Sequence, residues 1–358
     1  MLYWLTLLQA EFSGFNVFRY ITFRSVGAAV TAFVIMFLCG PRFIALMRRL
    51  KFGQMVRDDG PASHLAKQGV PTMGGLLMLA AIAVATLLWA RPDSALVWLV
   101  LGVTLFYGCI GAIDDYRKIS KKNSKGLSPR GKLLLQIIGA AAVALYLFCD
   151  PQYSSHLSLP FFKNWHPDLG WFYLPFAVAV IVGASNAVNL TDGLDGLAVG
   201  PSMITAAVYV VFAYLAGHVG LANYLDIPYI VGSGELAIFC AALFGGCLGF
   251  LWFNAYPAQI FMGDVGSLAL GGAIGSVAII IKQEFLLAIV GGVFVMEALS
   301  VIMQVGYFKA THGKRIFLMA PFHHHFEKQG WHEQKVVVRF WIISVVLGII
   351  AIATLKLR

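Results

Sequence analysis

Ten apolar stretches, separated by short polar links, divide this chain of 358 residues. Each holds about 17–25 residues, the length an α-helix needs to cross the hydrocarbon of a bilayer. Hydrophobic residues make up 59% of the chain and charged residues 12%, whereas soluble domains average about a quarter charged. The sequence therefore predicts an all-α polytopic membrane protein, one domain over residues 1–358, with about ten transmembrane helices. The ten stretches are residues 23–47, 71–90, 96–113, 133–149, 172–188, 201–217, 235–254, 265–281, 285–308 and 339–355.

The basic residues indicate how these spans are oriented. About two thirds of the 26 lysines and arginines fall in or beside the links after odd-numbered spans, and cytoplasmic links carry such an excess. We therefore expect the odd-numbered links in the cytoplasm and both termini in the periplasm. The aromatic-rich residues 1–22 predict an interfacial N-terminal segment. Residues 150–171, which contain three prolines, predict a periplasmic loop or hairpin.

Five aspartates lie at span ends that this orientation places on the cytoplasmic side. Asp114 and Asp115 end the third span, Asp192 and Asp195 follow the fifth, and Asp264 precedes the eighth. Acidic residues contribute little to topology, and each would cost about 2.5–3.5 kcal/mol at mid-bilayer. Mg²⁺ prefers one or two carboxylates together with substrate phosphate oxygens. Their convergence predicts a metal and phosphate site in a cytoplasmic active-site cleft of a membrane enzyme.

Two of these acidic segments also allow simpler explanations. The loop from Asp192 to Gly196 contains two Asp-Gly pairs, which can offer backbone N–H groups to a phosphate but are also common in turns. The segment Asn189–Thr191 is formally a glycosylation sequon, which has no meaning in a cytoplasmic loop. Asp264 stands where a helix begins and would serve equally as its N-cap.

Three consecutive histidines, His323 to His325, lie in the link after the ninth span. Ligands on one helix face recur at i and i+4, so all three cannot bind one ion from a helix, although a turn could direct two of them inward. A zinc site, a phosphate-binding cluster and a surface run are the alternatives. Because the link has no cysteine and no HExxH pattern, a phosphate-binding cluster is the preferred interpretation.

The ninth span is itself unusual, because Glu297 and Gln304 interrupt it. An ionisable group inside a span is functional by default, but Glu297 is equally consistent with a hydrogen-bonded structural carboxylate. Gly291, Gly292 and Gly306 would let this span bend or pack closely.

Taken together, these motifs resemble those of the phospho-N-acetylmuramoyl-pentapeptide transferases, a branch of the polyprenyl-phosphate N-acetylhexosamine-1-phosphate transferase superfamily. The resemblance runs from Lys67–Gly75 to the three histidines, and Lys118 and the segment Pro321–Glu327 favour this branch over relatives that use UDP-GlcNAc. It implies an enzyme of the bacterial inner membrane that acts in the first membrane step of peptidoglycan synthesis. The implied reaction transfers phospho-MurNAc-pentapeptide from UDP-MurNAc-pentapeptide to undecaprenyl phosphate, which gives lipid I and UMP and requires Mg²⁺. The implied assembly is a homodimer, with no nucleic-acid partner.

The resemblance also implies roles for individual residues. Asp264, which also lies at a span end, would be the principal Mg²⁺ ligand, Asp114 would orient the lipid phosphate or receive its proton, and Asp115 would shape the site with Lys118. A hydrophobic groove beside the bent ninth span would admit the polyprenyl tail. The residues implied to hold the uridine are Lys67, Gly193, Leu194, Asp195 and Phe261. Those implied to line the pyrophosphate region are Thr72, Asn189, Asp192, Asn254, His323 and His324, and the substrate-binding set also includes Asn186, Gln304 and His325.

Some alternatives stay open at this point. A secondary transporter would place its ionisable residues near mid-span, where only Glu297 fits. A sister transferase that uses UDP-GlcNAc is a closer competitor. Within the transferase hypothesis, direct attack by the lipid phosphate is simpler than a covalent phospho-aspartate intermediate, because a carboxylate bound to Mg²⁺ is a poor nucleophile.

Overall fold

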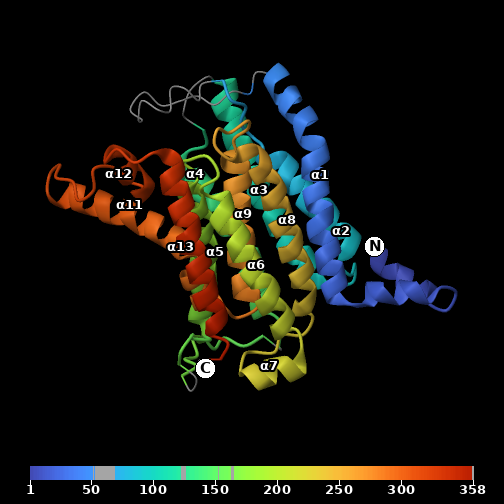
Figure 1. Ribbon diagram of the computed structural model, residues 1–358. Coiled ribbons are helices and arrows are strands. Elements are labelled where there is room, and N and C mark those ends of the chain that lie inside the picture. Colours follow the sequence, from blue (N-terminus) through green and yellow to red (C-terminus); the bar gives the residue numbers. More distant parts are fainter. Residues whose placement is uncertain (51, 53–68, 122–125, 152, 163–164, 357–358) are drawn as a thin grey trace.

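The computed structural model describes residues 1–50, 52, 69–121, 126–151, 153–162 and 165–356. In this part of the chain every regular element is a helix, as the sequence predicted; one isolated β-bridge joins His156 to Asp168 (Figure 1). The long helices are α1 (Ile21–Arg49), α3 (Ala95–Ser120), α4 (Pro129–Phe148), α5 (Tyr173–Thr191), α6 (Val199–Ala216), α8 (Leu236–Asn254), α9 (Gly263–Ile280), α11 (Gly292–Ala310) and α13 (Glu333–Ala353). The shorter ones are η1 (Leu2–Leu8), η2 (Ser13–Arg19), α2 (Gly75–Trp89), η4 (Gly170–Phe172), α7 (Val219–Leu225), η5 (Ser233–Glu235), α10 (Glu284–Val290) and α12 (Phe322–Lys328).

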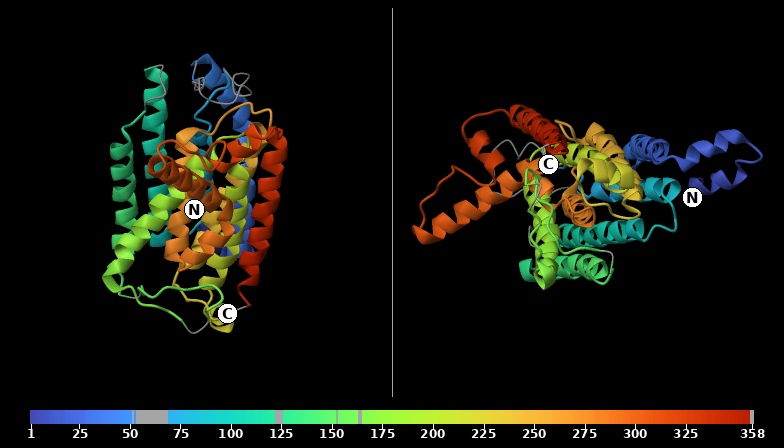
Figure 2. Two further views of the ribbon diagram at one scale, coloured as in Figure 1. Left: turned by 90° about the vertical axis from the view of Figure 1, so that its left-hand side faces the viewer. Right: turned by 90° about the horizontal axis from the view of Figure 1, so that it is seen from below.

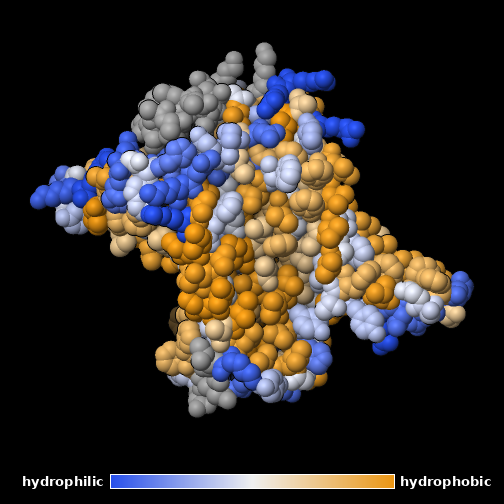
Figure 3. Space-filling view, in the orientation of Figure 1, coloured by the Kyte–Doolittle hydropathy of each residue, from blue (hydrophilic) through white to orange (hydrophobic). Residues whose placement is uncertain are grey.

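Nine helices of the described chain are long and apolar enough to cross a membrane, where about ten were predicted. The difference lies at residues 71–90, where α2 has only 15 residues. The first residues of the predicted stretch form a non-helical connection instead, which is held to Phe261: Gly74 N–H donates to Phe261 O (2.8 Å), and Phe261 N–H donates to Pro71 O (2.8 Å). Figure 3 shows a hydrophobic band across the middle of the bundle, with hydrophilic side chains above and below it.

The predicted span at residues 285–308 is divided into two helices. The chain forms α10 and α11, and Gly291 between them leaves the helical conformation (φ −88°, ψ 17°). The adjacent Gly292 packs so closely on α13 that a Cβ there would lie 2.7 Å from Leu347 Cδ1. Beyond this break, α11 projects sideways from the bundle, on the side opposite the N-terminal η1 and η2 (Figures 1 and 2). The predicted bend is therefore present at Gly291 and Gly292, whereas Gly306 lies within α11.

Helices α8 and α9 form the centre of the bundle. Helix α8 packs against α1, α2 and α6, whereas α9 packs against α3 and α5. No charged residue occurs between Asp264 and Lys282, so α9 can be buried on nearly all sides along its length. Asp264, in its first turn, is the charged residue at one end of this central helix.

A buried ion pair joins three helices at the opposite end of the bundle. Arg24 in the first turn of α1 donates through Nη1 and Nη2 to the Glu235 carboxylate (2.7 and 2.6 Å), and Arg91 N–H after α2 donates to the same carboxylate (2.9 Å). Arg24 is 1% exposed, so this bidentate pair is shielded from water. It ties the starts of α1 and α8 to the end of α2.

Candidate functional site

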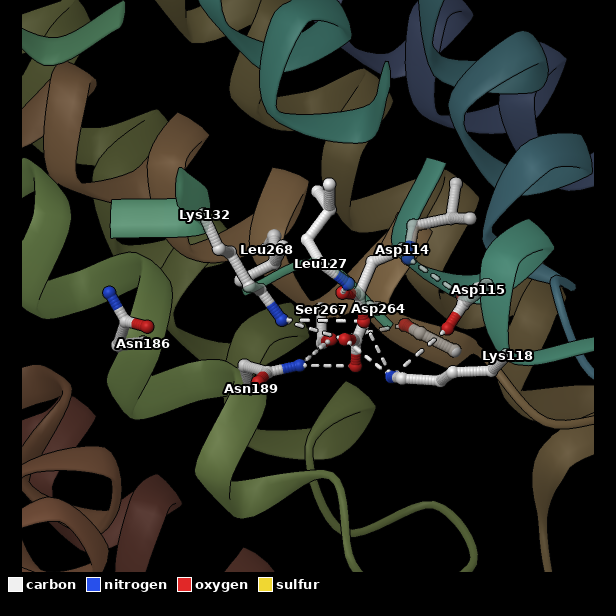
Figure 4. Close-up of polar contacts among 12 residues, drawn as sticks. Asp114, Asp115, Lys118, Leu127, Lys132, Asn186, Asn189, Asp264, Ser267 and Leu268 are labelled. Atoms are coloured by element: carbon white, nitrogen blue, oxygen red, sulfur yellow. Dashed lines mark hydrogen bonds and ion pairs between the residues drawn. The ribbon is translucent and has the colours of Figure 1, made fainter. Parts of the chain in front are cut away.

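Three carboxylates from distant parts of the chain meet at the first turn of α9. Asp114 and Asp115 come from the last turns of α3, and Asp264 comes from the start of α9. One oxygen from each lies within 4.8 Å of the others. In Figure 4 these side chains and Lys118 point toward one another. Of the five aspartates predicted to converge, these three form the cluster.

Close packing of α3 on α9 brings the aspartates together. At Gly111, one turn before Asp115, a Cβ would lie 2.2 Å from the Asp264 backbone oxygen. Only glycine allows this approach. Asp115 Oδ2 then accepts a hydrogen bond from Val265 N–H (3.2 Å), which satisfies a free donor of the first turn of α9. Asp264 itself is not the N-cap, which is Met262, so its carboxylate is available to the site.

Two lysines and an asparagine hold the Asp264 carboxylate. Oδ2 accepts from Lys118 Nζ (2.9 Å) and from Lys132 Nζ (2.7 Å), and Oδ1 accepts from Asn189 Nδ2 (2.8 Å). Lys118 Nζ also lies 2.6 Å from Asp114 Oδ2 and 3.6 Å from Asp115 Oδ1. A single cationic nitrogen thus contacts all three aspartates.

Lys132 was not selected from the sequence, where it counted only as one of the basic residues of a cytoplasmic link. The available signal is its position in the first turn of α4, which begins at Pro129 and is capped by Ser128 Oγ accepting from Gly131 N–H (3.2 Å). That helix start lies at the same end of the bundle as Asp114. Whether the side chain points toward the aspartates depends on how α4 is rotated.

The donor set fits a hard divalent cation. Three carboxyl groups face two ammonium groups, and oxygen ligands suit Mg²⁺. The side chains of Asp114 and Asp115 are 4% and 7% exposed, whereas that of Asp264 is 18% exposed. Asp264 is therefore the most accessible of the three to an ion or a substrate.

Asn186 and Asn189 lie one turn apart on α5 but differ in their contacts. Asn189 Nδ2 also donates to Ser267 Oγ (2.8 Å) on α9, whereas Asn186 Nδ2 donates to Gln136 Oε1 (2.9 Å) on α4. Figure 4 shows Asn189 beside Asp264 and Asn186 apart from the cluster. The structure therefore brings Asn189, but not Asn186, to the aspartates.

Hydrogen bonds to residues 254–260 hold the loop that follows α5. Asp195 Oδ2 accepts from Ala258 N–H (3.0 Å), and Gly196 N–H donates to Asn254 Oδ1 (3.0 Å). Asn254 Nδ2 in turn donates to Ile260 O (2.9 Å). Leu194 is buried in a small apolar cluster with residues of α11 and α13. The side chains of Asp195 and Asn254 thus shape the loop and join it to residues 258–260.

Asp192 is half-buried at the end of α5, and its carboxyl group has a raised pKa. Burial, together with the negative charges of Asp264 and Asp115, raises the pKa of the Asp192 carboxyl to about 8. Its neighbour Gly193 lies against His323, because a Cβ at Gly193 would be 2.3 Å from His323 Nε2.

The three histidines form part of the short helix α12; the rings of His323 and His324 lie close together, with centroids 4.1 Å apart, whereas His325 stacks on Phe322. His323 is buried, and His324 Nδ1 lies 2.6 Å from Glu327 Oε2. His325 Nδ1 accepts from Leu318 N–H (3.1 Å), on the outer side of this helix. Gln304 Oε1 accepts from Ile316 and Phe317 N–H groups (3.2 and 2.9 Å), so it supports the preceding loop.

Three predicted residues remain: Thr72 in the connection before α2, Phe261 in the connection before α9, and Lys67. Thr72 is buried, and its Oγ1 would lie 3.1 Å from a Cβ at Gly263, next to Asp264. Phe261 is half-buried and is held by backbone hydrogen bonds to this connection. Lys67 lies outside the described residues.

Comparison with known proteins agrees with this site. The model of the family described as "Glycosyl transferase family 4" matches residues 97–282, which include all three clustered aspartates. The chain is 72% identical to the phospho-N-acetylmuramoyl-pentapeptide-transferase of Desulfotalea psychrophila, over 98% of each chain. It is 58% identical to the protein of that name from Syntrophus aciditrophicus and 56% identical to that from Geobacter sp., again over 98% of each chain. The chain therefore belongs to glycosyl transferase family 4 and, within it, to the phospho-N-acetylmuramoyl-pentapeptide transferases.

Proposed function

We propose that the cluster of Asp114, Asp115 and Asp264 is the active site of a membrane phosphotransferase. The enzyme transfers phospho-MurNAc-pentapeptide from UDP-MurNAc-pentapeptide to undecaprenyl phosphate, and the products are lipid I and UMP. The observation that carries this proposal is the meeting of three carboxylates and two lysines from separate helices, in a chain 72% identical to a relative with that enzyme's name. This reaction is the first membrane step of peptidoglycan synthesis.

The chemistry requires charge neutralisation more than covalent assistance. An oxygen of the lipid phosphate attacks the phosphorus that carries the sugar, the bond to the UMP phosphate breaks, and UMP leaves. Both substrates are anionic, so approach and in-line geometry depend on fixed positive charge. Lys118 and Lys132 meet at Asp264 Oδ2 and supply this charge from two different helices.

The three aspartates have different exposures and contacts, and we assign each a different role. Asp264, the most exposed, would hold Mg²⁺, which when bound neutralises charge on the pyrophosphate oxygens. Asp114 Oδ1 accepts from Leu127 N–H (2.6 Å) and Oδ2 contacts Lys118, so this carboxylate is fixed where it can orient the lipid phosphate or take its proton. Asp115 is engaged with Val265 N–H and shapes the site.

Direct attack by the lipid phosphate is the mechanism we favour. Both oxygens of Asp114 and of Asp264 already accept from donors at 2.6–2.9 Å, and these contacts lower the nucleophilicity of the carboxylates. Radioactive label retained on the protein from the nucleotide substrate alone, with release of UMP, would contradict direct attack.

Substrate contacts follow the family resemblance. The uridine is assigned to Lys67, Gly193, Leu194, Asp195 and Phe261, and the pyrophosphate region to Thr72, Asn189, Asp192, Asn254, His323 and His324. Internal hydrogen bonds of Asp195 and Asn254 indicate that these two act mainly by shaping the loop. We also assign the chain to the bacterial inner membrane as a single-domain homodimer, with the aspartates toward the cytoplasm and both termini in the periplasm.

A transfer assay tests the proposal. Purified protein is given undecaprenyl phosphate, Mg²⁺ and either UDP-MurNAc-pentapeptide or UDP-GlcNAc, and butanol-extractable sugar and UMP are measured. We expect product from the muramoyl substrate alone. Extractable product from UDP-GlcNAc alone would identify a sister transferase, and proteoliposome uptake without lipid-linked product would identify a transporter.

Asp264→Asn is the most direct variant for the same assay. It should lower turnover by at least about 10²–10³-fold, because it removes charge that acts on the developing transition state. Asp93→Asn is the matched control, since Asp93 is an exposed acid that pairs with Arg91 between α2 and α3, at the other end of the bundle. Near-normal turnover in Asp264→Asn, with Asp93→Asn equally active, would show that the metal assignment is wrong.

A further inference from the structure

A buried carboxylate–histidine pair outside the aspartate cluster joins α11 to α12. Glu297 and His323 are both 0% exposed. His323 Nδ1 lies 3.2 Å from Glu297 Oε2, and His323 backbone N–H donates to Glu297 Oε1 (3.2 Å). A carboxylate inside an apolar helix needs such partners, because its burial without them would be costly.

This geometry shows which ring nitrogen faces the carboxylate. A carboxylate accepts hydrogen bonds and does not donate them when ionised, so Nδ1 carries the hydrogen that faces Glu297. Nε2 is then the atom left for another group. Among the described residues neither ring nitrogen makes a hydrogen bond, although both are buried; Nδ1 has the 3.2 Å approach to Glu297 Oε2, whereas Nε2 has no such carboxylate beside it.

The free nitrogen faces the loop after α5. A Cβ at Gly193 would lie 2.3 Å from Nε2, so a side chain at that position and the histidine ring cannot occupy this space together. The loop from Asp192 to Asp195 begins three residues after Asn189, which contacts Asp264. The His323 ring thus lies between Glu297 of α11 and Gly193 in the loop after α5.

We propose that Glu297 is a positioning residue for substrate binding. It holds His323 with Nδ1–H toward α11 and Nε2 toward Gly193, where Nε2 can hydrogen-bond a polar group of the nucleotide sugar. This inference rests on the proposed function for the identity of that ligand. Outer carboxylates that orient histidine ligands of metals have a comparable role, and their removal costs about 10–100-fold in affinity or activity.

Kinetics of Glu297→Gln provide the first test. The glutamine has one acceptor oxygen and cannot receive both N–H groups of His323, so the ring loses its fixed orientation. We expect KM for the nucleotide sugar to rise about tenfold or more, with a smaller change in kcat. Glu297→Asp, which keeps the charge, should restore part of the loss. Ser300→Ala is the matched control, since Ser300 is also buried on α11 and bonds only to the Glu297 backbone oxygen (2.7 Å).

A double-mutant cycle separates positioning from general structural support. If Glu297 acts through His323, Glu297→Gln should have little further effect on KM in a His323→Ala background. Additive effects, or a Glu297→Gln enzyme with unchanged KM and only a lower unfolding temperature, would overturn the proposal. So would Glu297→Asp being no better than Glu297→Gln.

Nitrogen-15 NMR of histidine-labelled protein gives a readout that does not depend on turnover. The His323 signals, assigned by their loss in His323→Ala, should report one tautomer with hydrogen on Nδ1 in the unmodified protein and a mixture in Glu297→Gln. The same tautomer mixture in both proteins would overturn the positioning role. Failure of the unmodified enzyme to transfer sugar phosphate would contradict the proposed function. The NMR measurement does not depend on that result, and it still shows whether Glu297 fixes the tautomer of His323.

Discussion

The contact between Gly111 and the start of α9 makes the position of Asp264 directly testable. In Gly111→Ala the new Cβ would lie 2.2 Å from Asp264 O, 2.4 Å from Asp264 C and 2.5 Å from Val265 N. Ordinary contacts begin at 3.4 Å, and all three atoms are backbone, so no side-chain rotation can relieve the overlap. The two helices must therefore separate by about 1 Å at this point. A misplacement of that size in catalytic groups costs about 10²-fold in rate.

We therefore expect Gly111→Ala to reduce the initial rate of UMP release by about 100-fold, because Asp264 moves away from Asp114 and Asp115. Gly102→Ala on the same helix is the control, since nothing lies within 4 Å of a Cβ at that position. It should keep normal activity. Overpacking also costs about 1–3 kcal/mol of stability, so unfolding temperatures in detergent are measured alongside. A Gly111→Ala enzyme as fast as Gly102→Ala would show that the close approach of α3 does not position the catalytic carboxylate.

Two further predictions concern stability. Arg24→Met should destabilise the protein by about 3–5 kcal/mol, because Glu235 keeps a buried charge without its partner. The double variant Arg24→Met with Glu235→Gln should recover much of this lost free energy of unfolding, measured with denaturant. No recovery would refute the explanation. Asp192 has a folded-state pKa raised to about 8, above its unfolded value of 3.8, so the native state binds more protons between these values and its stability falls as pH rises through this window. In metal-free buffer, Asp192→Asn should therefore gain in unfolding temperature over the unmodified protein as pH rises from about 5 to 8, and a constant difference would contradict the shift.

Several features of the fold were predictable because they depend on one residue at a time. The cost of moving a polar or charged side chain into lipid is set by its own chemistry, so apolar runs mark the helices that cross the membrane. The same cost placed Asp114, Asp115 and Asp264 at helix ends. The short α2 was not predicted, and the bend between α10 and α11 was predicted only from its glycines; both features involve close contacts with segments far away in the chain.

Some site residues could likewise be identified from the sequence, and others could not. Asp264 and Lys118 were identified as site residues and meet in the structure, whereas Lys132 was overlooked although it contacts Asp264 at 2.7 Å. Residue type and position do not reveal which way a lysine in the first turn of a helix points. Conversely, Gln304 and His325 matched the family pattern, yet they bond to the backbone of the loop before α12.

The amino-acid sequence by itself determined that this chain is helical and apolar enough for a membrane, where most of its long helices lie, and which acids stand at their ends, because transfer free energies act locally. Tertiary structure decided which of those acids share a site and which polar groups only brace a loop. That decision depends on the rotation and separation of packed helices, and contacts such as Gly111 on Asp264 or Gly193 on His323 set these distances between residues far apart in the chain.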